Sequence, residues 1–162
     1  MIEIFTGNVL DEPTGIIVHG CNCQGVMGAG IALQVKERFP EAYKVYRDMH
    51  EGSGLVLGEV TVAEIDQTKF IVNANTQNST GNGRQVSYDA IATCFETVVL
   101  LADYIRDTRG ENLAVMFPMI GAGLGGGNWE IISTIIDKTV PDRITKVLFQ
   151  FPRKADINHS TY

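Results

Sequence analysis

The sequence lacks several features that would assign it to a class of protein at once. None of its apolar runs approaches the roughly 20 residues that a helix needs to cross a membrane. The N-terminal segment "MIEIFTGN" has no basic region followed by an apolar stretch, so no secretory signal is predicted. Cysteine is scarce, with Cys21, Cys23 and Cys94 alone. This odd number without a signal predicts reduced thiols and a cytoplasmic protein.

Positive charge is also in short supply. The 13 Lys and Arg residues are outnumbered by 19 Asp and Glu residues, and the formal net charge is −6. Proteins that bind nucleic acids through the phosphate backbone are usually basic, so bulk nucleic-acid binding is not expected, although a modified end remains compatible. The 162 residues, 44% of them hydrophobic, suit one domain with a sizeable core. We expect that domain over residues 1–152, followed by a polar tail at 153–162.

The apolar residues alternate between the period of a strand and the period of a helix. Strands are predicted at residues 2–5, 14–20, 54–65, 69–75, 112–118 and 144–151, and helices at 28–39, from Pro40 onward, at 87–106 and at 128–137. Strands that alternate with helices predict an α/β fold whose sheet is covered on both faces. In such folds ligands bind beyond the carboxyl ends of the strands.

Two glycine-rich segments, residues 25–30 and 121–127, follow predicted strands and lead into predicted helices. Glycine lets the backbone approach a ligand closely, and the N–H groups at a helix start favour an anion. One such loop can also arise from close packing of a helix on a strand. Two of them at strand ends can face each other across a diphosphate. No G-K-[ST] of a P-loop occurs, and the segment after the first strand, "TGNVLDEPTG", lacks the G-x-G-x-x-G of a Rossmann fingerprint.

A family resemblance is carried by four segments, "TGNVL" (6–10), "IIVHGCNCQGVMGAGIALQVKERFP" (16–40), "IVNANTQ" (71–77) and "FPMIGAGLGGGNWEIISTII" (117–136). They resemble the macrodomain, an ADP-ribose-binding module. The resemblance is strongest to the ADP-ribose-1″-phosphate phosphatase branch, and to the terminal ADP-ribose glycohydrolase and DNA ADP-ribosyl glycohydrolase antitoxin branches. It implies a three-layer αβα sandwich with a mixed, mostly parallel sheet. The ligand implied is ADP-ribose, its 1″-phosphate or the ADP-ribosyl group of a modified macromolecule.

The resemblance also implies roles for individual positions. The loop after the first strand meets the adenine, Asn22 contacts the distal ribose, and the backbone of the two glycine loops holds the phosphates. Asn8 and Asn22 are open to a second interpretation, because asparagine in a loop is often a turn residue. The aromatic candidates for the adenine pocket lie on the last strand. The implied binding residues are Gly7, Asn8, Val9, Asn22, Gln24, Gly25, Val26, Met27, Gly28, Ala29, Gly30, Ile31, Gln77, Gly121, Ala122, Gly123, Leu124, Gly125, Phe149 and Phe151.

The positions of family catalytic residues are where this sequence departs from its relatives. Ala32 stands where some macrodomains have an aspartate, and Gln77 and Gly125 stand where the terminal glycohydrolase type has a lysine and an aspartate. None of the three supplies a nucleophile or a base. The predicted activity is therefore hydrolysis of ADP-ribose-1″-phosphate, with His19 and Asn22 as catalytic candidates. The alternatives are a binding module without turnover, and a glycohydrolase that uses other residues.

His19 and the neighbouring cysteines admit more than one interpretation. His19 could act as general acid toward a phosphate leaving group, or it could be a buried histidine that supports the loop. A zinc site needs about four ligands and Cys21-x-Cys23 offers two, so no metal is predicted, and no cofactor. Cys21 and Cys94 are interpreted as small buried packing residues.

Overall fold

The computed structural model describes residues 1–80, 85–123 and 125–152. Leu124 and the tail at 153–162 lie outside the described residues, so the predictions that name them stay untested. The elements follow one another as β1 (Glu3–Thr6), η1 (Val9–Asp11), β2 (Gly15–Asn22), α1 (Gly30–Arg38), α2 (Pro40–Glu51), β3 (Val60–Asp66), β4 (Lys69–Gln77), α3 (Tyr88–Arg109), β5 (Val115–Phe117), α4 (Trp129–Thr139) and β6 (Lys146–Gln150).

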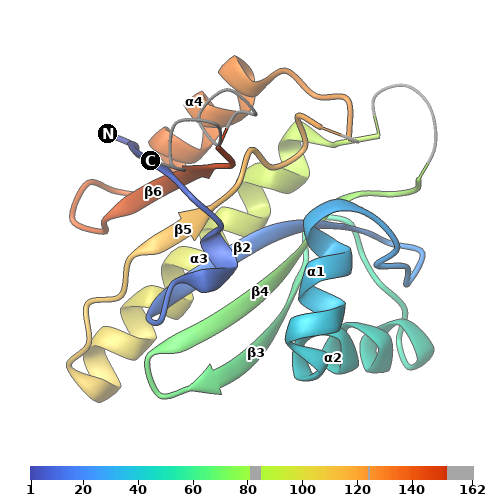
Figure 1. Cartoon of the computed structure of the whole chain (residues 1–162), viewed down its shortest axis with the longest axis horizontal. Helices are drawn as coiled ribbons and strands as arrows, with labels where there is room; N and C mark the ends of the chain where they lie inside the picture. The colour runs from blue at the N-terminus through green and yellow to red at the C-terminus, as the bar shows by residue number, and fades with distance from the viewer. Residues whose placement is uncertain (81–84, 124, 153–162) are drawn as a thin grey trace, which may run out of the picture.

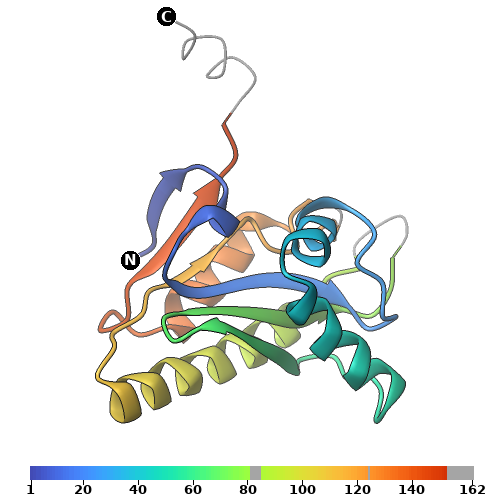
Figure 2. The same cartoon turned by 60° about the horizontal axis from the view of Figure 1, so that its bottom comes forward.

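Six strands form one sheet in the order β1-β6-β5-β2-β4-β3. All neighbouring pairs are parallel except β3 and β4, which are antiparallel. Helices α3 and α4 pack on one face, and α1 and α2 pack on the other (Figures 1 and 2). The predicted α/β sandwich with a mixed, mostly parallel sheet is confirmed.

The central strands β2 and β4 are buried along nearly their whole length. Alternate residues therefore enter two separate cores. Ile16 and Val18 of β2 contact the core under α3 and α4, whereas Ile17 and Cys21 contact the core under α1 and α2. The near-continuous apolar run in the sequence follows from this burial on both faces.

Two helices, α3 and α4, begin with a side-chain cap, whereas α1 does not, and this difference bears on the site. Ser87 caps α3 by accepting a hydrogen bond from the Ala90 N–H, and Asn128 caps α4 in the same manner. Ala29 precedes α1 and provides no side-chain cap. The first N–H groups of α1 therefore remain available to a ligand, because a helix leaves its first four N–H groups without an intrahelical partner.

One predicted strand begins later than expected, and one short helix was not predicted. The strand expected over 54–65 begins only at Val60, because Gly54 and Gly58 adopt φ values of 89° and 91° that break an extended strand. A short 3₁₀ helix, Val9–Asp11, was not predicted, and it begins where Asn8 accepts a hydrogen bond from the Leu10 N–H. Over the part of the chain that the structure describes, no helix is both long and apolar enough to span a membrane.

A buried lysine joins the last strand to the last helix. The Lys146 ammonium donates 2.7 Å to the Asp137 carbonyl and also donates to the Val140 carbonyl, while its side chain is 1% exposed. It lies 2.9 Å from the Asp137 carboxylate. Lys146 thus satisfies carbonyl groups at the C-terminal end of α4 that have no partner within the helix.

We expect Lys146→Met to lower the free energy of unfolding by about 2–4 kcal/mol, because it leaves the Asp137 and Val140 carbonyl groups without their donor. The matched control is Lys44→Met, whose side chain is 73% exposed in an ion pair on the surface of α2. That change should cost less than about 0.5 kcal/mol. Urea denaturation measures both, and equal small effects would contradict the structural role of Lys146.

Candidate functional site

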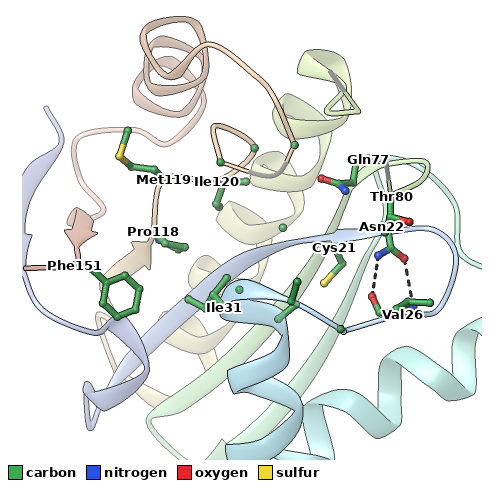
Figure 3. A pocket seen from close by; sticks show the side chains of 18 residues that line it. Cys21, Asn22, Val26, Ile31, Gln77, Thr80, Pro118, Met119, Ile120 and Phe151 are labelled. Atoms are coloured by element: carbon green, nitrogen blue, oxygen red, sulfur yellow. Dashed lines mark hydrogen bonds between the residues drawn. The ribbon is translucent and has the colours of Figure 1, made fainter. Parts of the chain in front are cut away.

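A cleft of about 520 Å³ lies at the carboxyl ends of the parallel strands, within the usual range for small-molecule sites. Its walls come from the end of β2, the end of β4, the segments that follow β5 and β6, and the first turn of α1 (Figure 3). The lining residues are Gly20, Cys21, Asn22, Val26, Gly28, Ala29, Gly30, Ile31, Ala32, Gln77, Thr80, Pro118, Met119, Ile120, Gly121, Gly123, Gly125 and Phe151. Among the described lining residues, none carries a charged side chain.

The two glycine-rich segments both reach this cleft. Gly28, Ala29, Gly30 and Ile31 line it at the uncapped start of α1. Gly121, Gly123 and Gly125 line it from the other side. The structure therefore places the two loops on one cleft, as predicted from their positions after strands. Backbone N–H groups at a helix start, aided by the helix dipole, are suited to hold an anion.

The second glycine loop is folded tightly on itself. The Gly127 N–H donates 2.7 Å to the Gly121 carbonyl, and the Gly125 carbonyl accepts from the Gln85 and Val86 N–H groups. A Cβ atom added at Gly125 would lie 2.9 Å from the Gly121 oxygen and 3.0 Å from Gln77 Oε1. Glycine at position 125 is thus required by backbone packing, and the loop has no room there for an acidic side chain.

Asn22 is a turn residue that also lines the cleft. Its Oδ1 accepts a hydrogen bond of 2.9 Å from the Gln24 N–H, which is the pattern of a turn residue, and its Nδ2 donates 2.8 Å to the Val26 carbonyl (Figure 3). It also lines the cleft. The turn is what holds the Asn22 amide at the wall of the cleft.

Some of the residues expected around adenine line the cleft, and others do not. Phe151 lines the cleft, while Phe149 is buried and stacks on Phe5 with 6.0 Å between ring centroids. Asn8 caps the 3₁₀ helix and donates 3.0 Å to Gln34 Oε1. Asn8, Val9 and Phe149 are not among the residues that line the cleft.

Three other predicted binding residues contact the rest of the protein and do not line the cleft. The Gly7 N–H donates 2.8 Å to the Gln150 carbonyl, next to the last strand. Gly25 packs against α2, where Arg47 donates 2.9 Å to its carbonyl. Met27 is 2% exposed and belongs to the core under α1 and α2. These three do not line the cleft, whereas Val26 does.

Two more predicted residues lie beside the cleft lining. The Gln24 side chain accepts a 3.4 Å hydrogen bond from Thr80 Oγ1, which joins the loop after β2 to the segment after β4. Ala122 packs against the core under α3 and α4. Gln77 lines the cleft as expected, and its Nε2 donates 3.0 Å to the Ser79 carbonyl.

His19 is fully buried and does not line the cleft. Its Nε2 lies 2.6 Å from Asn73 Oδ1, and the Asn73 amide nitrogen donates to the Ala42 carbonyl and to Thr61 Oγ1. The Asn73 oxygen must therefore be the acceptor, so His19 carries its proton on Nε2 and donates it to Asn73. Burial lowers the pKa of His19 to about 4. This placement favours the supporting role over the general-acid role.

The cysteines are reduced and poorly suited to nucleophilic attack. Cys21 lines the cleft, but burial raises the pKa of its thiol well above the usual value. Burial also raises the pKa of the Cys94 thiol to about 12. A thiolate is needed for attack, so neither group is activated. No cluster of three or more His, Cys, Asp or Glu side chains suited to a metal occurs within residues 1–80, 85–123 and 125–152.

The three positions that lack a family catalytic group are brought together. Ala32, Gln77 and Gly125 all line the cleft, and Gly125 lies against the Gln77 side chain. The cleft thus presents neutral side chains and backbone groups, with no acid or base among its described residues. Such a lining is suited to hold an anion through backbone N–H groups.

Several lining residues were not predicted as site residues. They are Gly20, Cys21, Ala32, Thr80, Pro118, Met119 and Ile120. Most of them lie at or just after the carboxyl end of a strand. Pro118, Met119 and Ile120 fill the gap between β5 and the second glycine loop, so extending that loop back to its strand would have found them.

Comparison with known proteins identifies the family. The Macro domain family model matches residues 18–136. The chain belongs to the macrodomain family. The macrodomain is 34% identical over 134 residues to a DNA ADP-ribosyl glycohydrolase of Mycobacterium tuberculosis. The matched region covers 80% of this chain but 36% of that relative. The chain thus spans about a third of the length of that relative.

Two further proteins are similar to this chain over a larger share of their own length or of this chain. An ADP-ribose 1″-phosphate phosphatase of Candida albicans is 25% identical over 137 residues, covering 80% of the macrodomain and 88% of the relative. The solved structure of Thermosipho africanus DarTG in complex with ADP-ribose has a TM-score of 0.72 at 21% identity. It covers 93% of this chain and 42% of that chain. This last similarity supports the fold alone.

The tight second loop of the macrodomain generates a prediction. Gly125→Ala should lower the free energy of unfolding by about 1–3 kcal/mol, because the added methyl group contacts backbone that must move. Gly123→Ala is the matched control, since a Cβ there would meet nothing within 4 Å among the described atoms. It should change stability by less than about 0.5 kcal/mol. Denaturant titration distinguishes the two, and equal effects would mean that the loop opens freely.

Buried His19 should make the macrodomain sensitive to acid. Its pKa falls from 6.5 to about 4 on folding. Well above pH 6.5 the ring is neutral in both states. As the pH falls from 6.5 toward 4, the unfolded chain takes up a proton that the folded chain does not, so stability decreases by about 3 kcal/mol. In His19→Gln the decrease over this window should be smaller by that amount. An unchanged pH profile of unfolding in the variant would contradict the burial of a neutral His19.

Proposed function

We propose that the chain binds ADP-ribose and its derivatives in this cleft and hydrolyses ADP-ribose-1″-phosphate to ADP-ribose and phosphate. The observation that carries the proposal is the pair of glycine loops that face one cleft, one of them at the uncapped start of α1. A diphosphate needs several donors close together. Backbone N–H groups provide them where the described lining has no charged side chain.

The distribution of polar groups supports one orientation of the ligand. Asn22, Gln77 and Thr80 gather at one end of the cleft, and Pro118, Met119 and Phe151 lie along the other (Figure 3). A ribose needs hydrogen-bond partners, whereas an adenine ring can be held by apolar and aromatic contacts. The terminal ribose is therefore assigned to the Asn22 end and the base to the Phe151 end.

The lack of an acid or base in the described lining favours phosphate as the leaving group. Phosphate departs as an anion whose own pKa is near neutrality, so it makes little demand on a protein acid. Release of ADP-ribose from a nucleobase, or from the hydroxyl or guanidine group of a side chain, demands more assistance, because these leaving groups are stronger bases. Similarity to a phosphatase over 88% of that relative's length agrees with this choice.

Two other functions remain as candidates. A binding module without turnover is favoured by the neutral lining of the cleft. A hydrolase that acts on ADP-ribosylated DNA or protein is favoured by the 34% identity to DNA ADP-ribosyl glycohydrolase. Ala32, Gln77 and Gly125 argue against the family routes that need an aspartate or a lysine at those positions.

A panel of substrates separates the three functions. Calorimetry with ADP-ribose tests the shared binding step, and no binding at millimolar ligand would overturn all of them. Phosphate release from ADP-ribose-1″-phosphate supports the proposed reaction, and binding without release of any product leaves the binding module. Release of ADP-ribose from modified DNA or protein alone would replace the phosphatase by a glycohydrolase. Loss of phosphate release in His19→Gln with binding intact would restore the general-acid role of His19.

The assigned orientation predicts the effect of two phenylalanine substitutions. Phe151→Ala should weaken ADP-ribose binding by about tenfold, because aromatic contact with a base contributes on the order of 1–3 kcal/mol. It should weaken AMP to a similar degree and leave ribose 5-phosphate unchanged. Phe5→Ala is the matched control, because Phe5 is 55% exposed, compared with 53% for Phe151, and does not line the cleft. Equal effects of the two substitutions would contradict the placement of the base beside Phe151.

A further inference from the structure

Tyr46 on α2 contacts Asn22, which lines the cleft, from the protein interior. Tyr46 is fully buried and does not line the cleft. Its hydroxyl lies 2.8 Å from the Asn22 carbonyl oxygen and 2.9 Å from Asn22 Oδ1, and it can donate its one proton to either. Burial raises the pKa of Tyr46, so the hydroxyl stays protonated and remains a donor.

The Asn22 side-chain oxygen is fully occupied by the protein. It accepts from the Gln24 N–H at 2.9 Å and from the Val26 N–H at 3.4 Å, and it lies 2.9 Å from the Tyr46 hydroxyl, which donates either to it or to the Asn22 carbonyl. Rotating the amide by half a turn would place its NH₂ group against these three donors. The orientation of the amide is therefore determined by its partners.

The amide nitrogen is left with one hydrogen to offer. Nδ2 donates to the Val26 carbonyl at 2.8 Å, and an asparagine amide nitrogen has two hydrogens. Among the described residues, Nδ2 has no second acceptor, and Asn22 lines the cleft. Asn22 can thus present a donor, and not an acceptor, to a ligand.

We propose that Tyr46 is a positioning residue that holds the Asn22 amide with its nitrogen toward the ligand. The cleft thereby selects nucleoside diphosphates that carry a further sugar, whose oxygen atoms accept this hydrogen bond. The inference rests on the proposed function, because it assigns the terminal ribose to the Asn22 end. Tyr46 acts through Asn22, and it has no contact with the ligand itself.

Calorimetry with ADP-ribose and with ADP, which lacks the terminal ribose, tests the proposal. Tyr46→Phe should weaken ADP-ribose by about fivefold, as expected for one hydrogen bond, and change ADP by less than about twofold. Asn22→Ala should show the same selective loss. The double variant should bind like Asn22→Ala alone, because two residues that act through one contact are not additive. Tyr43→Phe, the same substitution on the same helix, should change neither affinity.

Three results would overturn the proposal. One is equal weakening of ADP-ribose and ADP in Tyr46→Phe, since that indicates a general loosening of the loop. Another is an unchanged preference for ADP-ribose over ADP in Tyr46→Phe. If the unaltered protein binds ADP-ribose, this result leaves the proposed function intact. The third is additive losses in the double variant. Failure of the unaltered protein to bind ADP-ribose overturns the proposed function and this inference together.

A second variant covers the case in which Tyr46→Phe does not fold. Asn22→Asp retains Tyr46 and replaces the presented nitrogen by an oxygen. The proposal expects the ratio of ADP-ribose affinity to ADP affinity to fall by at least about fivefold. An unchanged ratio would show that the Asn22 nitrogen does not contact the terminal sugar, and it would overturn the role of Tyr46.

Discussion

Parallel pairing of β2 with β4 on one side and β5 on the other is the interaction on which the site depends. Parallel strands place their carboxyl ends at the same edge of a sheet, so segments that are about 90 residues apart in the chain meet there. The first glycine loop follows β2, and the second follows β5. β2 is buried on both faces and contributes residues to both cores.

The cleft offers no charged side chain among its described residues. Its described lining consists of backbone groups, apolar side chains and neutral polar side chains, and the chain as a whole carries a formal charge of −6. Recognition of an anion then depends on the direction of N–H groups and on the helix dipole, which act over a few ångströms. Such a site distinguishes ligands by geometry, and it gains little from long-range attraction.

The fold and the glycine loops could be predicted because they depend on local patterns. Burial on both faces makes β2 a continuous apolar run, and each loop follows a strand. The side of the sheet on which His19 lies could not be predicted. Alternation shows that His19 and Cys21 share a face, but a strand buried on both sides has no polar face to tell which one.

The remaining site predictions depended on contacts between distant segments. Phe149 and Phe151 have the same parity along the chain, yet Phe149 lies within β6 and packs on Phe5, whereas Phe151 follows the end of the strand. Asn8 is engaged by Leu10 and Gln34, and Asn22 by Tyr46. The link between Tyr46 and Asn22 joins a helix to a strand end 24 residues away, and no local pattern indicates it.

The crowding at Gly125 limits how this chain could change its chemistry in evolution. A change from glycine to aspartate is a small step in sequence, but here the backbone oxygen of Gly121 occupies the space that the new side chain would enter. An acidic group at this position would require the loop to be rebuilt first. A carboxylate at position 125 would therefore need several residues of the loop to change together.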